Sequence, residues 1–289
     1  MMKMHSKSKY YLICIVLVII TILPLSIKTV FAFGSGIHLV GTDIEPGVYR
    51  TTGEITYFAR LSGLTGEFSD IIANEALPQP PVLVEIKATD VAFESKGTGQ
   101  WTIIDDAYQP EPATSFGGGW WLVGTDIIPG LYRTEDTVNY LARLSGLGAE
   151  FQDIIANDIP PNGPVVVEIK GSDLAFHSKT DGIWSLVDES YSPQVRSTIG
   201  DGYWIVNLDI LPGIYHTEDD VQYYARLSGF GNEFQDIISN AVLVSGGTYL
   251  EILESDVGFL TEGGAQWTRL EIEPNANLLP GILFLLLDE

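Results

Sequence analysis

TDIIPGLYR, at residues 125–133, occurs in nearly the same form as TDIEPGVYR at 42–50 and LDILPGIYH at 208–216. The interval is 83 residues each time, and it also separates the members of three other sets: Arg60, Arg143 and Arg226; Trp101, Trp184 and Trp267; and the blocks ARLSG at 59–63, 142–146 and 225–229. Solenoid repeats are shorter, roughly 20–50 residues, and cannot bury a core alone. A patterned unit of about 70 residues can bury a small one. Three tandem modules are therefore predicted, with one pseudo-threefold body as the alternative.

Each unit has the pattern of an all-β fold. VNYLARL (138–144) and PVVVEIKG (164–171) alternate between two faces, which is typical of strands. Many short strands between Gly and Pro turns predict a small β-sandwich or barrel-like module. One stretch, EFQDIIAN (150–157), places Phe151, Ile154 and Ile155 at helical spacing. It predicts a turn or two of helix or 3₁₀-helix, with its apolar residues inward.

The repeated phrase itself is interpreted as a hairpin corner. Pro129 presets φ at the first central position of a turn, and Gly130 can take the positive φ that a type II turn requires at the second. Thr125 and Asp126 can hydrogen-bond to the turn backbone. The phrase is expected to recur for folding, because every module turns the same corner.

The N-terminus has the pattern of a secretory signal. Three lysines precede an apolar run at 10–27, and Val30 and Ala32 occupy the small-residue positions of a cleavage site. The alternative is an uncleaved membrane anchor formed by residues 10–27. Either way the chain is expected outside the cytoplasm, secreted or at the cell surface. The predicted boundaries are a signal peptide at 1–32, modules at 33–105, 119–188 and 202–271, linkers at 106–118 and 189–201, and an apolar tail at 272–289.

Charge and cysteine content exclude several classes of function. The chain has 15 basic and 38 acidic residues, a net charge of −23. Four of the basic residues and none of the acidic ones lie in 1–32, so the remainder carries −27. Nucleic acid is therefore not an expected partner. Cys14 is the only cysteine, which leaves no disulfide or thiolate site after cleavage.

No catalytic residue is predicted. His38, His177 and His216 do not recur at equivalent positions, as three similar hydrolase sites would require. They are interpreted as surface or incidental histidines. Ser62, Ser145 and Ser228 lie in ARLSG, which is not a nucleophile elbow, and are expected to serve turns.

The recurring charged residues are expected to be structural. The three arginines lie between apolar neighbours and need carboxylate partners; the candidates are Asp70, Asp153 and Asp236, or Asp90, Asp173 and Asp256. The alternative is an exposed arginine that grips an anion. Glu150, Asp153, Asn157 and Asp173 recur as oxygen donors, but no calcium-loop motif is present. No cofactor or metal is predicted, with weak Ca²⁺ binding as the alternative.

Aromatic residues also recur in all three units: Tyr49, Tyr132 and Tyr215; Tyr57, Tyr140 and Tyr223; and Trp101, Trp184 and Trp267. Trp120 and Trp121 add a local excess. A small sheet needs large rings to fill its core. The alternative is a carbohydrate-binding face, which would require several rings exposed together.

The string V-G-x-D-I-x-P-G-x-Y, A-R-L-S-G and D-I-I-x-N resembles a small β-module of uncharacterised secreted bacterial proteins. The resemblance covers residues 37–271 and implies export, but no activity. The third copy departs from it at Asn207, Leu208 and Ser239. We expect a non-enzymatic binding or adhesion protein for an extracellular glycan or protein, with three similar sites gaining avidity. The alternatives are a hydrolase with a site between modules, using His177 and His216, or a structural spacer.

Overall fold

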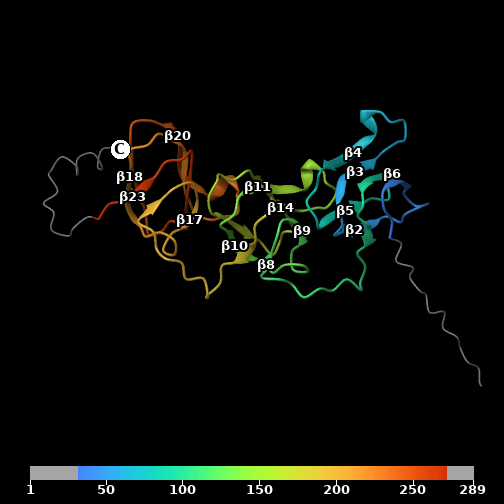
Figure 1. Ribbon diagram of the computed structural model, residues 1–289, viewed down its shortest axis with the longest axis horizontal. Coiled ribbons are helices and arrows are strands. Elements are labelled where there is room, and N and C mark those ends of the chain that lie inside the picture. Colours follow the sequence, from blue (N-terminus) through green and yellow to red (C-terminus); the bar gives the residue numbers. More distant parts are fainter. Residues whose placement is uncertain (1–31, 272–289) are drawn as a thin grey trace, which may run out of the picture. The chain divides into compact units, whose positions relative to one another are not determined.

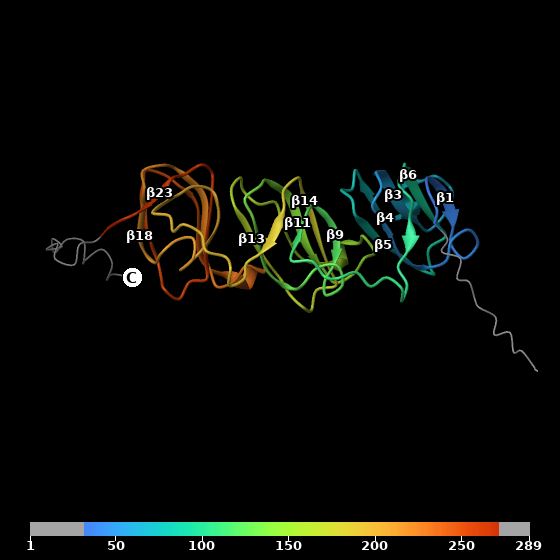
Figure 2. The same ribbon diagram turned by 60° about the horizontal axis from the view of Figure 1, so that its bottom comes forward.

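The computed structural model describes residues 32–271, which form an all-β protein (Figures 1 and 2). The predicted signal segment, except Ala32, and the predicted tail lie outside the described residues. All three modules belong to one compact unit. Within residues 32–271, no helix has the length and apolar character needed to cross a membrane.

Each module consists of two antiparallel sheets, as predicted for a small sandwich. In module 1 the sheets have the orders β1-β6-β3-β4 and β5-β2-β7. Its strands are β1 (Gly36–Leu39), β2 (Gly47–Thr51), β3 (Ile55–Leu61), β4 (Ile71–Ala76), β5 (Val82–Ile86), β6 (Ala92–Gly97) and β7 (Thr102–Ile103), with the 3₁₀-helix η1 (Phe68–Asp70) before β4.

Modules 2 and 3 repeat this topology and add one short strand each to the second sheet. The sheets of module 2 have the orders β12-β11-β14-β9 and β13-β10-β15-β8, and those of module 3 β17-β22-β19-β20 and β16-β23-β18-β21. The elements of module 2 are β8 (Ser115–Phe116), β9 (Gly119–Leu122), β10 (Gly130–Thr134), β11 (Val138–Leu144), η2 (Phe151–Asp153), β12 (Ile154–Asp158), β13 (Val165–Ile169), β14 (Ala175–Thr180) and β15 (Trp184–Leu186). Those of module 3 are β16 (Thr198–Ile199), β17 (Gly202–Ile205), β18 (Gly213–Thr217), β19 (Val221–Leu227), η3 (Phe234–Asp236), β20 (Ile237–Val244), β21 (Thr248–Ile252), β22 (Gly258–Glu262) and β23 (Trp267–Arg269).

Two of the three recurring sets of rings fill the space between the two sheets of each module, whereas Tyr57, Tyr140 and Tyr223 are only partly buried. The indole nitrogen of Trp184 donates to Ser178 Oγ over 3.0 Å, and Trp101 and Trp267 make the equivalent bond to Ser95 and Thr261. The three tryptophans are fully buried, as are Tyr49, Tyr132 and Tyr215. Their interpretation as core residues is therefore confirmed.

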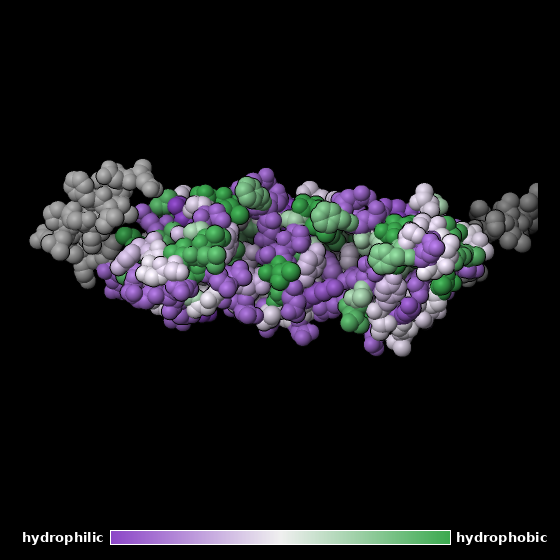
Figure 3. Space-filling view, turned by 90° about the horizontal axis from the view of Figure 1, so that it is seen from above, coloured by the Kyte–Doolittle hydropathy of each residue, from purple (hydrophilic) through white to green (hydrophobic). Residues whose placement is uncertain are grey.

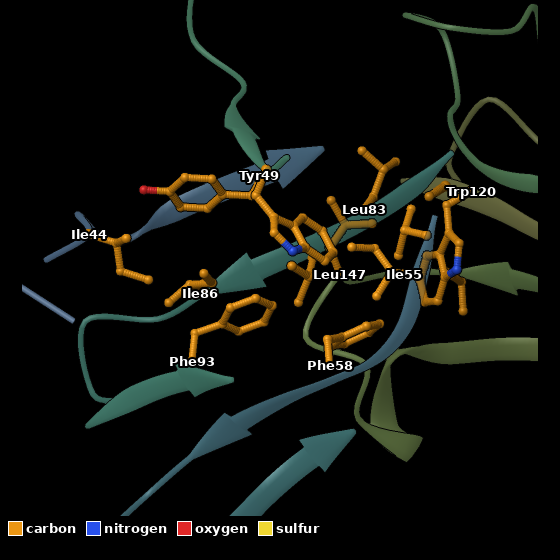
Figure 4. Close-up of a cluster of buried hydrophobic side chains, with 14 of the residues drawn as sticks. Ile44, Tyr49, Ile55, Phe58, Leu83, Ile86, Phe93, Trp120 and Leu147 are labelled. Carbon is orange, nitrogen blue, oxygen red and sulfur yellow. The ribbon is translucent and has the colours of Figure 1, made fainter. Parts of the chain in front are cut away.

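The cores continue across the boundaries between modules. Trp120 and Leu147 of module 2 belong to the same buried cluster as Tyr49, Phe58 and Phe93 of module 1 (Figure 4). In the same way, Phe230 of module 3 lies in the cluster of module 2. Each module therefore completes the core of the module before it, and the expectation of a self-sufficient core in every unit was incomplete.

The interpretation of the repeated phrase as a hairpin corner was wrong. β9 and β10 do not pair; β9 pairs with β14 in one sheet, and β10 pairs with β13 and β15 in the other. The tight turn lies earlier, where Gly124 has a φ of +78° and the N–H of Asp126 bonds to the carbonyl of Leu122. Gly130 begins β10 and is not among the positive-φ residues. The phrase carries the chain from one sheet to the other.

Two further expectations differ from the structure. The predicted linkers 106–118 and 189–201 contain β8 and β16, which pair with β15 and β23, so their second halves belong to the following module. Residues 151–153 do form a 3₁₀-helix. Its Phe151, however, is 90% exposed and does not point inward, and the equivalent Phe68 and Phe234 are exposed in the same way.

Candidate ligand-binding clefts at the module boundaries

In each module the recurring arginine pairs with the aspartate 30 residues later; Arg60 and Arg143 are buried, whereas Arg226 is partly exposed. The guanidinium of Arg60 donates from Nε and Nη2 to both oxygens of Asp90, at 2.7 and 2.8 Å. Arg143 with Asp173, and Arg226 with Asp256, repeat this bidentate pair. The predicted internal clamp is confirmed with this aspartate set. The other candidates, Asp70, Asp153 and Asp236, instead accept bonds from backbone N–H groups around the 3₁₀-helices.

The same arginine also reaches into the next module. Arg60 Nη1 donates to the carbonyl of Gly148 and to Glu150 Oε1, both at 2.8 Å. Lys87 Nζ lies 2.6 Å from the same Glu150 oxygen. Lys87 and then Arg60 lower the pKa of Glu150, so the carboxylate stays charged. Arg143, Lys170, Gly231 and Glu233 form the equivalent contact between modules 2 and 3.

A second ion pair crosses each boundary. Arg50 Nη1 donates to Asp126 Oδ2 over 2.8 Å, and Arg133 Nη1 to Asp209 Oδ2 over 2.7 Å. Asp126, part of the repeated phrase, also accepts from the backbone N–H of Leu122 within its turn. The phrase therefore serves the boundary as well as the turn. These paired contacts fix the walls of the spaces between modules.

The first cleft lies at the boundary of modules 1 and 2 and has a volume of about 560 Å³. Asn74 and Glu75, near the end of β4, line it from module 1. Module 2 supplies Trp120 from β9, Tyr140 from β11, and His177 and Lys179 from β14. Phe151 lies at the rim. Small-molecule sites typically have volumes of roughly 300–1,000 Å³.

Three buried polar atoms around the first cleft have no hydrogen-bond partner among residues 32–271: Glu75 Oε2, Trp120 Nε1 and His177 Nε2. His177 stacks on Trp120 with ring centroids 4.3 Å apart, and its Nε2 lies 3.9 Å from Glu75 Oε1, too far for a direct bond. Buried polar groups are nearly always paired with protein or water. Their side chains line the cleft, and these three atoms are the unsatisfied donors and acceptors beneath its surface.

Two of the three carboxylates that line the first cleft, Glu75 and Glu150, are paired with cations. Lys179 Nζ lies 2.8 Å from Glu75 Oε1. Burial raises the pKa of Glu75, and the charge of Lys179 opposes this shift. The indole N–H of Trp120 also lowers the pKa of Glu75, but it does not form a hydrogen bond of acceptable geometry with the carboxylate. Burial, and then Lys179, lower the pKa of His177 to about 3. The imidazole is neutral at ordinary pH, so the expectation of a surface or incidental histidine was wrong for this residue.

The second cleft, of about 500 Å³, occupies the equivalent place between modules 2 and 3. Here Tyr203 OH donates to Asp158 Oδ2 over 2.5 Å, and Asn232 Nδ2 is buried without a partner. Burial raises the pKa of Asp158. Phe234 lies at this rim as Phe151 does at the first. The two clefts therefore have the same ion pairs between modules around them, but they differ in the polar side chains that line them.

The other predicted residues do not gather at a site. His38 contacts Phe33. His216 stacks on Tyr249 in module 3, with ring centroids 4.2 Å apart. Neither histidine lines either cleft. The recurring serines donate to the carbonyls of Asp70, Asp153 and Asp236. Asp173 is bound to Arg143, and Glu150 to Arg60 and Lys87, so the expected oxygen donors are dispersed. Across residues 32–271, no cluster of three or more metal-ligating side chains is found.

Sequence reasoning missed Glu75 and Lys179. Neither recurs in all three modules: Asp158 and Ala241 stand at the positions equivalent to Glu75, and Lys96 and Glu262 at those equivalent to Lys179. Residues that recur in all three modules build the fold and the contacts between modules. Residues that do not recur supply the polar groups that distinguish one cleft from the other. His177 and Trp120 carried that signal, because their equivalents are Glu94 and Leu260, and Ile37 and Tyr203.

A model of the Rv1352-like extracellular domain matches the chain three times, at residues 31–102, 113–185 and 196–268. No curated protein and no solved structure matches the chain. The three matches together cover more than half of its length and coincide with the three two-sheet modules. They also place the modules outside the cytoplasm, as the signal segment predicts. The chain therefore belongs to the Rv1352-like extracellular domain family, as an exported protein with three copies of the domain.

Proposed function

We propose that this extracellular protein binds a neutral saccharide, and that the first cleft is its principal site. The observation that carries the proposal is the convergence of Glu75 Oε2, Trp120 Nε1 and His177 Nε2, all buried and unpartnered, on one cleft. An unmet buried donor or acceptor costs about 1–3 kcal/mol. A ligand hydroxyl group can both donate and accept, and so suits a carboxylate, an indole N–H and a neutral imidazole together.

The charge balance favours a neutral ligand over an ion. Lys179 is already paired with Glu75, and Glu150 with Arg60 and Lys87. An anion would have to displace a carboxylate from its cation, and a cation would have to compete with Lys179. A hydroxylated ligand needs no such exchange.

The exposed phenylalanine at the rim supports the same ligand class. Phe151 is one of three equivalent rings, with Phe68 and Phe234, that lie almost fully in solvent. On the face drawn in Figure 3, hydrophobic side chains form separate patches among hydrophilic ones. An aromatic ring beside polar groups can stack on the apolar face of a sugar ring while its hydroxyls bond inside.

The binding proposal differs from the expectation of three equal sites. The shared aromatic and charged residues hold the fold, and the candidate sites belong to boundaries, of which the described residues contain two. Multivalency would then come from two clefts of different polarity. A hydrolase using His177 and His216 receives no support, because His177 lines the first cleft whereas His216 stacks on Tyr249 and lines neither cleft, and His177 is a weak base with a pKa of about 3.

The test is a binding screen of the chain from Phe33 onward against an oligosaccharide library, followed by titration calorimetry on any hit. Phe151→Ala and Glu75→Gln should each weaken binding about ten-fold or more. Phe68→Ala is the matched control, because the same exposed ring lies on module 1 where no preceding module forms a boundary cleft; it should leave the affinity unchanged. The proposal fails if no saccharide binds, or if the two cleft variants bind as tightly as the control.

A further inference from the structure

The two ends of the three-module array carry complementary halves of the internal boundary. At each boundary, one module presents an edge face and the next a loop face. The edge face is made of the outer edge of β5 or β13 with Arg60 and Lys87, or Arg143 and Lys170. The loop face is made of Trp120, Leu147 and Glu150, or of Tyr203, Phe230 and Glu233. The loop face of module 1 and the edge face of module 3 lie at the two ends of the array. No described residue covers either of them.

The loop face of module 1 keeps its docking groups. Ile37, Leu64 and Glu67 stand where Trp120, Leu147 and Glu150 stand in module 2. Leu64 is 55% exposed, whereas Leu147 is 2% exposed because module 1 covers it. Ala59, Leu61 and Ala92 form a small apolar cluster behind this face, which is separate from the main core. Glu67 has no cationic partner within residues 32–271.

The edge face of module 3 keeps the complementary groups. Arg226 binds Asp256 through Nε and Nη2, but its Nη1 makes no hydrogen bond within the described part of the chain. The backbone N–H groups of Glu85 and Glu168 bond to the carbonyls of Leu147 and Phe230 across the boundaries. The equivalent N–H of Glu251 makes no such bond to another described residue. Tyr249, which replaces the fully buried Leu83 and Val166, is 66% exposed.

We propose that the edge face of module 3 docks on the loop face of module 1 of a second copy of this chain. The contact would join Arg226 Nη1 to Glu67, the N–H of Glu251 to the carbonyl of Leu64, and the ring of Tyr249 to Leu64. Terminal repeats of an array that ends in solvent usually have a polar outer face. Here the edge face has Tyr249 and Leu253 exposed instead. Because the two faces differ, the contact is heterologous and propagates from copy to copy.

This contact is weaker than the internal boundaries. Module 3 has His216 in place of Arg50 and Arg133, and Leu253 in place of Lys87 and Lys170. It also has Gly247 in place of Pro81 and Pro164, so it keeps the backbone carbonyl acceptor but lacks the proline ring that lies against Gly119 and Gly202 at the internal boundaries. One of the three boundary cations therefore remains. Association is expected to depend on protein concentration, and it does not depend on saccharide binding.

Sedimentation velocity over a concentration series, on the chain from Phe33 onward, tests the proposal. The wild type should form dimers and longer species as concentration rises. Leu253→Lys restores the cation that faces the glutamate at both internal boundaries, and should tighten association about two- to five-fold, as for a partly exposed ion pair of about 0.5–1 kcal/mol. Both Leu253 and Glu67 are exposed, so substitution there leaves the fold intact.

Charge reversal gives the decisive comparison. Leu253→Glu should weaken association by placing two carboxylates together, and Glu67→Lys should weaken it likewise, whereas the double variant should recover it. The proposal is overturned if wild type and Leu253→Lys stay monomeric at all concentrations, or if Glu67→Lys leaves association unchanged. It is also overturned if association appears only after removal of residues 272–289, because that segment would then be the occupant of the edge face.

Discussion

Replacement of His177 by leucine should remove much of the acid sensitivity of this protein. Leu260 occupies the equivalent position in module 3, so leucine suits the site. Burial lowers the pKa of His177 to about 3, whereas an unfolded histidine has a pKa near 6.5. As pH falls below about 6.5, the unfolded chain takes up a proton that the folded chain cannot accept until pH nears 3. Acid therefore favours unfolding.

The size of this effect follows from proton linkage. One proton bound only by the unfolded state changes the free energy of unfolding by about 1.4 kcal/mol per pH unit. Between pH 7 and pH 5, a histidine with these two pKa values lowers stability by about 2 kcal/mol. The raised pKa of Glu75 acts in the opposite direction, since the folded state then takes up its proton first. Glu75 is present in both proteins, so its contribution largely cancels in the comparison.

Urea unfolding followed by tryptophan fluorescence, at pH 7 and pH 5, measures the difference. The wild type should lose about 2 kcal/mol more than His177→Leu between these pH values. His216→Leu is the control, because it keeps His177 and should keep most of the acid loss. Equal losses in the wild type and His177→Leu would refute the reasoning, since the buried histidine would then not be the group that links protons to unfolding.

Two further predictions concern the boundary of modules 1 and 2, and each has a matched control in module 1. Glu150→Gln should lower the free energy of unfolding by about 1–2 kcal/mol, because two cations share this carboxylate. Glu67→Gln should change it by less than about 0.5 kcal/mol. Urea titration measures both variants, and equal effects would contradict a stabilising role for the contact of Arg60 and Lys87 with Glu150. Gly119→Ala should lower the thermal midpoint more than Gly36→Ala. Both glycines have positive φ, but a Cβ at 119 would lie 2.5 Å from the Pro81 ring and one at 36 meets nothing closer than 3.5 Å. Similar midpoints for the two alanine variants would show that the close approach to Pro81 carries no cost.

Local patterns predicted the strands, the central 3₁₀-helices and the core rings because each depends on neighbours within one module. Trp184 is an example: its ring fills the space between its own two sheets, and its partner Ser178 is six residues away. The failures concern contacts between modules. Val166 and Arg143 lie where an isolated sandwich would be solvated, and both are buried because the next module covers them.

The error at the repeated phrase has a related cause. Pro–Gly is compatible with a type II turn and equally with entry into a strand, and only pairing decides between them. Gly124, φ +78°, makes the actual turn, and Asn207 replaces it in module 3 with a φ of +67°. Asparagine tolerates this conformation, so this departure from the repeat preserves the same backbone.

The amino-acid sequence by itself determined the export, the all-β class and the three-fold repetition, because apolar periodicity and an 83-residue interval are properties of the chain. Tertiary structure decided where one module ends and the next begins, and which side chains remain unsatisfied there. Glu75, Trp120 and His177 are far apart in sequence, and a cleft exists among them only because β4 of one module meets β9 and β14 of the next. Burial and hydrogen bonding depend on what lies across that boundary, and no pattern within one repeat contains that information.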